Sequence, residues 1–181
     1  AAHHAPAPAV LASRLNQAVA ETGRGRMFIT LSLLVLDPAG CRAEHLRAGH
    51  NPPLVWRARS GECEWRKPRG IGLGLTAGPA FEANLETEVI EFAPGDMMVM
   101  YSDGVTEDMN PEGEQFGEQR LAELVMRHAR EGPRRLANAI MEEARAFRRE
   151  AELHDDWTLL AVQCTGRAPQ EEGQAKTAGE V

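Results

Sequence analysis

The segment of residues 94–107 constrains the fold more than any other part of the sequence, because it joins a buried element directly to a polar turn. It opens on a Pro-Gly turn, since proline fixes φ and glycine takes the positive φ that such turns need. Residues 97–101 are then apolar without alternation, which is typical of a strand buried on both faces. The run ends on Ser-Asp-Gly, so Asp103 lies at the end of a rigid element, where metal ligands and reacting groups are commonly held.

Asp103 has two interpretations on this segment alone. An Asp-Gly pair is common in hairpin turns, where it carries no chemistry. A second segment favours a metal site, because Asp155 and Asp156 stand immediately before the strand-like residues 157–164. Adjacent acids also occur in ordinary solvent-exposed loops. Two strands that each begin or end at a carboxylate nevertheless suit Mg²⁺ or Mn²⁺, which take oxygen ligands.

Composition restricts the class of protein and its partners. The chain has 181 residues, of which 43% are hydrophobic and 26% charged, as expected for one globular domain. Its net charge of −7, with acids and bases interspersed, disfavours a nucleic-acid partner. No apolar run approaches the roughly 20 residues of a membrane helix, and no signal-peptide pattern is present. We therefore expect a cytoplasmic protein that does not insert into a membrane.

The cysteines indicate neither a disulfide framework nor thiol chemistry. The chain has three cysteines, Cys41, Cys63 and Cys164, and this odd number without metal-ligand spacing favours a reducing compartment. Cys41 and Cys63 each begin a Cys-x5-Arg match, ending at Arg47 and Arg69, and this is the spacing of cysteine-dependent phosphatases. A phosphate-binding loop needs glycine and a following helix N-terminus. Both matches lack these features, so we interpret them as chance.

Hydrophobic periodicity predicts strands joined by hairpins and segregated from helices. We expect helices at residues 9–22, around 121–128 and after Gly132, and strands at 27–37, 41–48, 54–59, 62–66, 81–89, 97–101 and 157–164. This order predicts an α+β fold, a sandwich or layered sheet with helices outside. The glycine-rich residues 68–78 lack the lysine of a nucleotide-binding loop and do not join a strand to a helix, which disfavours nucleotide binding.

Three parts of the chain differ in composition. Residues 1–8 are rich in Ala, His and Pro and predict a linker or frayed end. Residues 9–164 contain all the periodic segments and predict one domain. Residues 165–181 contain Gly, Gln and Glu and almost nothing apolar, which predicts a disordered tail.

Five motifs in a fixed order resemble a known family. They are Ala-Gly-His-Asn-Pro-Pro at 48–53, Ile-Gly-Leu at 71–73, the segment 94–107, Gly-Glu-Gln-Phe-Gly at 113–117, and Asp-Asp-Trp-Thr-Leu at 155–159. Together they resemble the SpoIIE/RsbU-like branch of the bacterial metal-dependent Ser/Thr protein phosphatases, in the PPM superfamily. The resemblance covers about residues 9–164, and five ordered motifs are far more specific than any single one.

The resemblance implies a fold, a metal site and an activity. The fold would be an antiparallel β-sandwich flanked by helix pairs, with a two-metal Mn²⁺ or Mg²⁺ site at one end. Asp103 and Asp155 match metal-binding aspartates of the family and would be its catalytic metal ligands, with Asp156 as a neighbouring candidate. A metal-bound water would attack phosphorus without a protein nucleophile. Substrates in this branch are typically phosphoserine or phosphothreonine on small antagonist proteins that control anti-sigma factors.

Two earlier motifs of the family have no match in this sequence. These are a Gly-Gly-Asp and an Asp-x-x-Gly-His-Gly, which carry the metal-bridging aspartate. The first residue is Ala rather than Met. We therefore expect the C-terminal part of a phosphatase domain without its N-terminal strands, with an upstream sensor domain possible. Missing strands would leave an unpaired sheet edge, which favours a homodimer or aggregation.

Two classes of function follow from this sequence. The leading hypothesis is a metal-dependent protein Ser/Thr phosphatase of a bacterial signalling pathway. The alternative is a non-catalytic phosphatase-like module that binds a regulatory partner without turnover. The two upstream motifs distinguish these hypotheses, because only the enzyme requires the bridging aspartate.

Overall fold

The computed structural model describes residues 7–23 and 27–166 as seven strands, five α-helices and one 3₁₀ helix. The helices are α1 (Pro8–Gly23), α2 (Pro79–Glu82), α3 (Asp103–Thr106), α4 (Gly117–His128), η1 (Ala129–Glu131) and α5 (Pro133–Arg148). The strands are β1 (Leu31–Asp37), β2 (Arg42–Ala48), β3 (Leu54–Trp56), β4 (Cys63–Trp65), β5 (Thr87–Glu91), β6 (Met97–Tyr101) and β7 (Leu159–Gln163). No helix in this part of the chain has the length and apolar character needed to cross a membrane.

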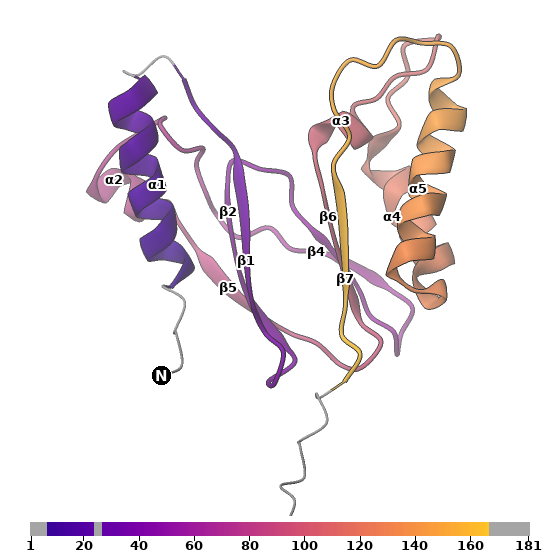
Figure 1. Cartoon of the computed structure of the whole chain (residues 1–181), viewed down its shortest axis with the longest axis horizontal. Coiled ribbons are helices and arrows are strands. Elements are labelled where there is room, and N and C mark those ends of the chain that lie inside the picture. The colour runs from indigo at the N-terminus through magenta and orange to yellow at the C-terminus, as the bar shows by residue number, and fades with distance from the viewer. Residues whose placement is uncertain (1–6, 24–26, 167–181) are drawn as a thin grey trace, which may run out of the picture.

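The elements form four layers, with two antiparallel sheets between two layers of helices (Figure 1). One sheet has the order β1-β2-β5 and packs against α1, and Phe81 of α2 joins the same buried cluster. The other has the order β4-β3-β6-β7 and packs against α4 and α5. The predicted α+β sandwich with helices outside is therefore confirmed.

Three apolar clusters separate these layers. The first lies between the four-stranded sheet and the helices α4 and α5, and includes Trp56, Val99 and Ile140. The second lies between α1 and the three-stranded sheet. The third, centred on Val55, Ile90 and Met98, joins the inner faces of the two sheets. Strand β6 contributes alternate residues to the first and third clusters, which explains why its sequence is apolar without alternation.

The hairpins follow the predicted turns. β1 pairs with β2 from Leu31↔Ala48 to Asp37↔Arg42, and β3 pairs with β4. β1 is shorter than predicted, because Ile29 leaves the sheet register and exchanges backbone hydrogen bonds of 3.0 and 2.8 Å with Leu73. The glycine-rich segment 68–78 thus pairs with the residues that lead into β1.

The strand predicted at residues 81–89 is wrong in its first half. Residues Pro79–Glu82 form helix α2, and the strand begins only at Thr87. Gly78 precedes the helix with a positive φ of 59°, and Pro79 occupies the first turn, where its missing N–H costs no hydrogen bond. Phe81 is buried under α1. Its apolar side chain therefore serves packing against this helix and does not belong to the alternating pattern of a strand.

Helix α1 and strand β7 are the outermost elements of the described residues, and the predicted domain at 9–164 remains a prediction. Helix α1 begins at Pro8, one residue before the predicted start. The last strand ends at Gln163. The predicted linker at 1–8 and tail at 165–181 fall almost entirely outside the described residues, so both remain predictions.

Candidate metal site

The candidate site lies at the end of the sandwich where β6 ends and β7 begins. These strands are antiparallel neighbours, and Tyr101↔Leu159 is their last pair. The residues after β6 and those before β7 therefore emerge side by side (Figure 1). This topology brings the backbone at Asp103 and Gly104 against the segment that carries Asp155 and Asp156.

Ser102 fixes the distance between the two segments. Its backbone N–H donates to the Thr158 carbonyl at 3.0 Å, and its Oγ accepts the Thr158 N–H at 2.9 Å. The same hydroxyl donates to the Asp156 carbonyl at 3.0 Å. One side chain thus holds the backbone of the segment that carries Asp156 against the end of β6.

Gly104 allows this close approach. A Cβ atom at this position would lie 2.5 Å from the Asp156 carbonyl oxygen and 3.3 Å from that of Asp155. Any side chain would therefore force the two segments apart. Asp103 begins helix α3 and does not form a two-residue hairpin turn, so the hairpin interpretation of Asp-Gly is wrong.

The three carboxylates are exposed, and the hydrogen bonds that those of Asp103 and Asp155 accept from the described residues are local. Asp103 Oδ1 accepts the Gly104 N–H at 3.1 Å, and Asp155 Oδ1 accepts the Asp156 N–H at 2.7 Å. In residues 7–23 and 27–166 no Lys, Arg or His side chain forms an ion pair with any of them. Their charge and oxygen donors therefore fit a hard divalent cation.

The ligand set is incomplete. Across the described ranges, no group of three His, Cys, Asp or Glu side chains is placed to hold a metal ion. A divalent cation of this class needs six or more oxygen ligands, part of which can be water. Asp103, Asp155 and Asp156 therefore supply part of a site and do not form a closed cage.

Sequence reasoning missed a buried polar cluster beside this site. Asp108 follows α3 and has a side chain that is 1% exposed, 3.9 Å from Arg148 at the end of α5. The Arg148 guanidinium lies 4.7 Å above the ring of Trp157, which follows Asp156 directly. No sequence pattern marks these residues, because their proximity depends on how α5 packs.

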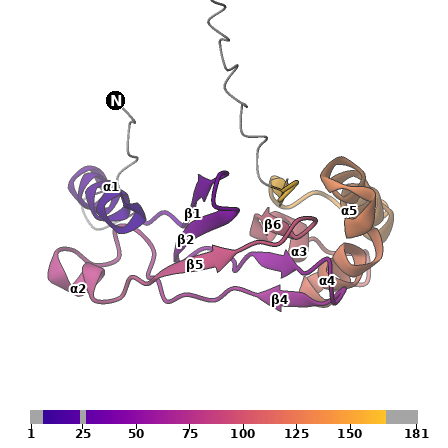
Figure 2. The ribbon, with the colours of Figure 1, turned by 90° about the horizontal axis from the view of Figure 1, so that it is seen from below.

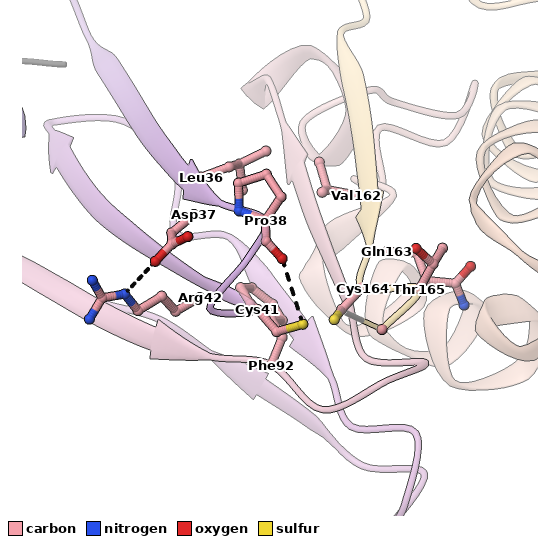
Figure 3. A pocket seen from close by; sticks show the side chains of 11 residues that line it. Leu36, Asp37, Pro38, Cys41, Arg42, Phe92, Val162, Gln163, Cys164 and Thr165 are labelled. Atoms are coloured by element: carbon pink, nitrogen blue, oxygen red, sulfur yellow. Dashed lines mark hydrogen bonds and ion pairs between the residues drawn. The ribbon is translucent and has the colours of Figure 1, made fainter. Parts of the chain in front are cut away.

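A pocket at the opposite end of the sandwich offers no alternative catalytic site. It lies between the β1–β2 turn and the end of β7, and apolar side chains such as Leu36, Phe92 and Val162 line much of it (Figure 3). Its carboxylate, Asp37, is paired with Arg42 at 3.0 Å. Because the pocket lies at the opposite end of β7 from Leu159, it is remote from the three candidate ligands.

The cysteines do not form phosphatase loops. Cys41 precedes strand β2, and Arg47 within this strand donates to the carbonyls of Pro68 and His50. Cys63 lies in strand β4, where burial raises the pKa of its thiol to about 11. A thiol with such a pKa is a poor nucleophile near neutral pH. This geometry argues against a cysteine phosphatase, and no disulfide is present in the described residues.

Comparison with known proteins identifies the family. The family model of stage II sporulation protein E (SpoIIE) matches residues 1–165. The chain belongs to the SpoIIE family. This membership and the sandwich fold together confirm a SpoIIE/RsbU-like phosphatase domain of the PPM type.

Two curated relatives of this SpoIIE-family chain are longer than it. The phosphoserine phosphatase RsbU of Bacillus subtilis is 26% identical over 159 residues, which are 86% of this chain and 44% of RsbU. The protein IcfG of Synechocystis is 31% identical over 105 residues, which are 58% of this chain and 16% of IcfG. The chain thus spans less than half the length of either relative.

Solved structures share the fold. The PP2C domain of SiaA from Pseudomonas aeruginosa has a TM-score of 0.72 at 19% identity, covering 86% of this SpoIIE-family chain and 60% of that one. The manganese-soaked phosphatase domain of SpoIIE from Bacillus subtilis has a TM-score of 0.62 at 18% identity, covering 94% and 79%. At these identities the likeness establishes the fold alone.

Proposed function

We propose that this chain is the metal-binding part of a protein Ser/Thr phosphatase that depends on Mn²⁺ or Mg²⁺. The observation that carries the proposal is the junction at Ser102, which holds Asp103 beside the segment of Asp155 and Asp156. Family membership supports the same reaction class. A relative soaked with manganese and another in complex with magnesium support the choice of cations.

Each residue of the site has a separate role in this proposal. Asp103 and Asp155 bind the cation, and Asp156 is the additional candidate ligand. Ser102 and Gly104 set the separation of the two ligand-bearing segments. A bound cation of this kind supplies a nucleophilic water and stabilises charge on the phosphoryl oxygens. Because these ligands extend from the paired strands β6 and β7, their backbone positions are fixed before metal binds.

The substrate class and setting are part of the same proposal. We propose phosphoserine or phosphothreonine on a small regulatory protein, such as an anti-sigma factor antagonist, as the substrate in the cytoplasm. The relative RsbU is named a phosphoserine phosphatase, which supports this class. An upstream sensor domain and a second copy of the chain are further proposed partners.

Metal titration with matched variants tests the assignment. We expect the chain to bind Mn²⁺ weakly in calorimetry, and Asp103→Asn or Asp155→Asn to reduce the affinity by about tenfold or more. Asp37→Asn is the matched control, because Asp37 is a paired carboxylate at the other end of the sandwich. Equal Mn²⁺ affinity of wild type and both site variants would refute the ligand assignment.

Turnover is tested in the longest form of the protein that can be expressed. Hydrolysis of a phosphoserine peptide should require Mn²⁺ and should be lost in Asp103→Asn and Asp155→Asn. Cys41→Ser and Cys63→Ser should retain it, since neither thiol takes part. Activity that survives a chelator but disappears with Cys41→Ser would reverse the assignment from metal to thiol chemistry.

A second candidate function is a phosphatase-like module that binds a regulatory protein without turnover. The incomplete ligand set of the described residues favours it, because a two-metal displacement stabilises both the attacking and the leaving oxygen. This module would bind a phosphorylated peptide stably in the presence of Mn²⁺ and release no phosphate. The enzyme would release phosphate under the same conditions.

A further inference from the structure

Asp108 is a buried carboxylate without a hydrogen bond to any side chain in the described residues. It follows helix α3, its side chain is 1% exposed, and within residues 7–23 and 27–166 no side chain forms a hydrogen bond with either carboxylate oxygen. Its backbone carbonyl accepts the Phe116 N–H at 2.8 Å, which fixes its position before α4. Burial raises the pKa of this carboxyl, and the charge of Arg148, the backbone N–H of Met109 and the charge of His154 oppose the shift. An ionised carboxylate in such a place needs a nearby cation.

Arg148 is the cation that faces Asp108. Its Nη1 lies 3.9 Å from Asp108 Oδ2, is buried, and has no hydrogen-bond partner among the described residues. The guanidinium is centred 4.7 Å from the ring of Trp157, in the geometry of a cation–π contact. Arg148 thus contacts one residue from each of the two segments that carry the candidate ligands.

The connections of this cluster lead directly to the metal site. Asp108 comes five positions after Asp103, and the α3 turn between them is closed by the Glu107 N–H donating to the Asp103 carbonyl at 2.8 Å. Trp157 stands between Asp156 and Thr158, whose backbone groups are bonded to Ser102. The three side chains therefore connect the residues that follow α3, the end of α5 and the residues that precede β7.

We propose that Asp108, Arg148 and Trp157 form a positioning cluster that holds the segment of Asp155 and Asp156 in its place for metal binding. This inference rests on the proposed function for its metal readout. None of the three residues is a metal ligand in it. Arg148 acts through Trp157, and Asp108 acts through Arg148 by fixing its guanidinium.

The test measures the same variants with and without metal. Asp108→Asn keeps the shape of the side chain and removes its charge, and Arg148→Met removes the cation but keeps an unbranched apolar chain. Arg149→Gln is the matched control, because Arg149 is the next residue and pairs with exposed Glu112. Hydrogen exchange of the Thr158 amide is followed in metal-free protein, and Mn²⁺ affinity is followed by calorimetry.

The expected pattern separates positioning from general stability. Exchange of the Thr158 amide should accelerate about tenfold in Asp108→Asn and in Arg148→Met, at temperatures where each variant stays folded. Mn²⁺ affinity should fall about tenfold in both variants. The double variant should bind Mn²⁺ no more weakly than the single variant with the lower affinity, because both changes disrupt the same interaction. Arg149→Gln should match wild type in both measurements.

Other outcomes would overturn the inference or the function separately. Thr158 exchange at the wild-type rate in both variants, or equal acceleration in Arg149→Gln, would overturn the positioning cluster. A lower melting temperature with unchanged exchange and unchanged Mn²⁺ affinity would show that the cluster only stabilises the fold. If wild type fails to bind Mn²⁺ while the exchange pattern appears, the cluster stands and the metal assignment of Asp103 and Asp155 fails.

Discussion

His45 is a fully buried base between the two sheets, and its protonation is linked to folding. Its Nε2 lies 3.1 Å from the Ser32 hydroxyl, while its Nδ1 has no hydrogen-bond partner in the part of the chain that the structure describes. Burial, with smaller contributions from the charges of Arg47 and Arg66, lowers the pKa of His45 to about 4. The folded protein therefore contains neutral His45 at pH 7, as does most of the unfolded chain.

We expect the free energy of unfolding to fall as the pH is lowered through the window between 6.5 and 4. There the unfolded chain binds a proton at His45 that the folded chain does not bind, so acid favours unfolding. The full effect is at most about 3.5 kcal/mol, since one pKa unit corresponds to about 1.4 kcal/mol. His45→Gln should flatten this pH dependence in urea titrations.

His154→Gln provides the control for this measurement. His154 is exposed, and its replacement removes one histidine without altering the inter-sheet layer. The free energy of unfolding of the His154→Gln protein should depend on pH as that of the wild type does. A His45→Gln protein that loses stability between pH 6.5 and 4 as steeply as wild type would assign the effect to other groups.

At the scale of elements, Asp96 connects the turn before β6 to the β3–β4 hairpin. Its side chain is 3% exposed and accepts three hydrogen bonds, from the Ala58 N–H at 2.9 Å, the Ala93 N–H at 3.1 Å and Arg57 Nη1 at 3.0 Å. Removing such a carboxylate leaves buried donors without an acceptor. Asp96→Ala should therefore lower the free energy of unfolding by about 3 kcal/mol.

Glu86→Ala is the comparison for Asp96→Ala. Glu86 also accepts a backbone N–H, from Arg69 at 3.1 Å, but its side chain is 52% exposed. Exposed pairs of this kind contribute at most about 1 kcal/mol. Chemical denaturation of both variants checks the prediction. Equal losses would show that burial of Asp96 does not determine the cost.

Elements with strong local signals were predictable from the sequence. The turns at residues 37–40 and 60–61 gave the hairpins β1–β2 and β3–β4 because their chemistry is local. Helix α2 was missed because the burial of Phe81 comes from α1, which is far away in sequence. Asp103 and Asp155 could be named as candidates because one closely follows β6 and the other shortly precedes β7, whereas Asp108 carries no local signal and is placed by packing against α5.

At the scale of the whole molecule, two edge strands leave inward-facing leucines exposed on one side. β1 and β7 are both edge strands, and they lie on the same side of the molecule (Figure 2). Leu36 pairs in register with Ala43, and Leu160 with Met100, so both leucines belong to the inner faces of their sheets. They are nevertheless 49% and 51% exposed. Apolar edge strands of this kind favour pairing with another chain.

We therefore expect this chain to associate with itself as its concentration rises, through the side formed by β1 and β7. Leu160→Lys should shift sedimentation profiles toward monomer, because a charge on an exposed edge opposes strand pairing. Met126→Lys is the matched control, since Met126 is 45% exposed on α4, far from this edge. Association that persists in Leu160→Lys, or that is lost equally in Met126→Lys, would place the interface elsewhere. A wild-type chain that stays monomeric at every concentration would show that the exposed leucines are tolerated singly, as isolated apolar residues are on most protein surfaces.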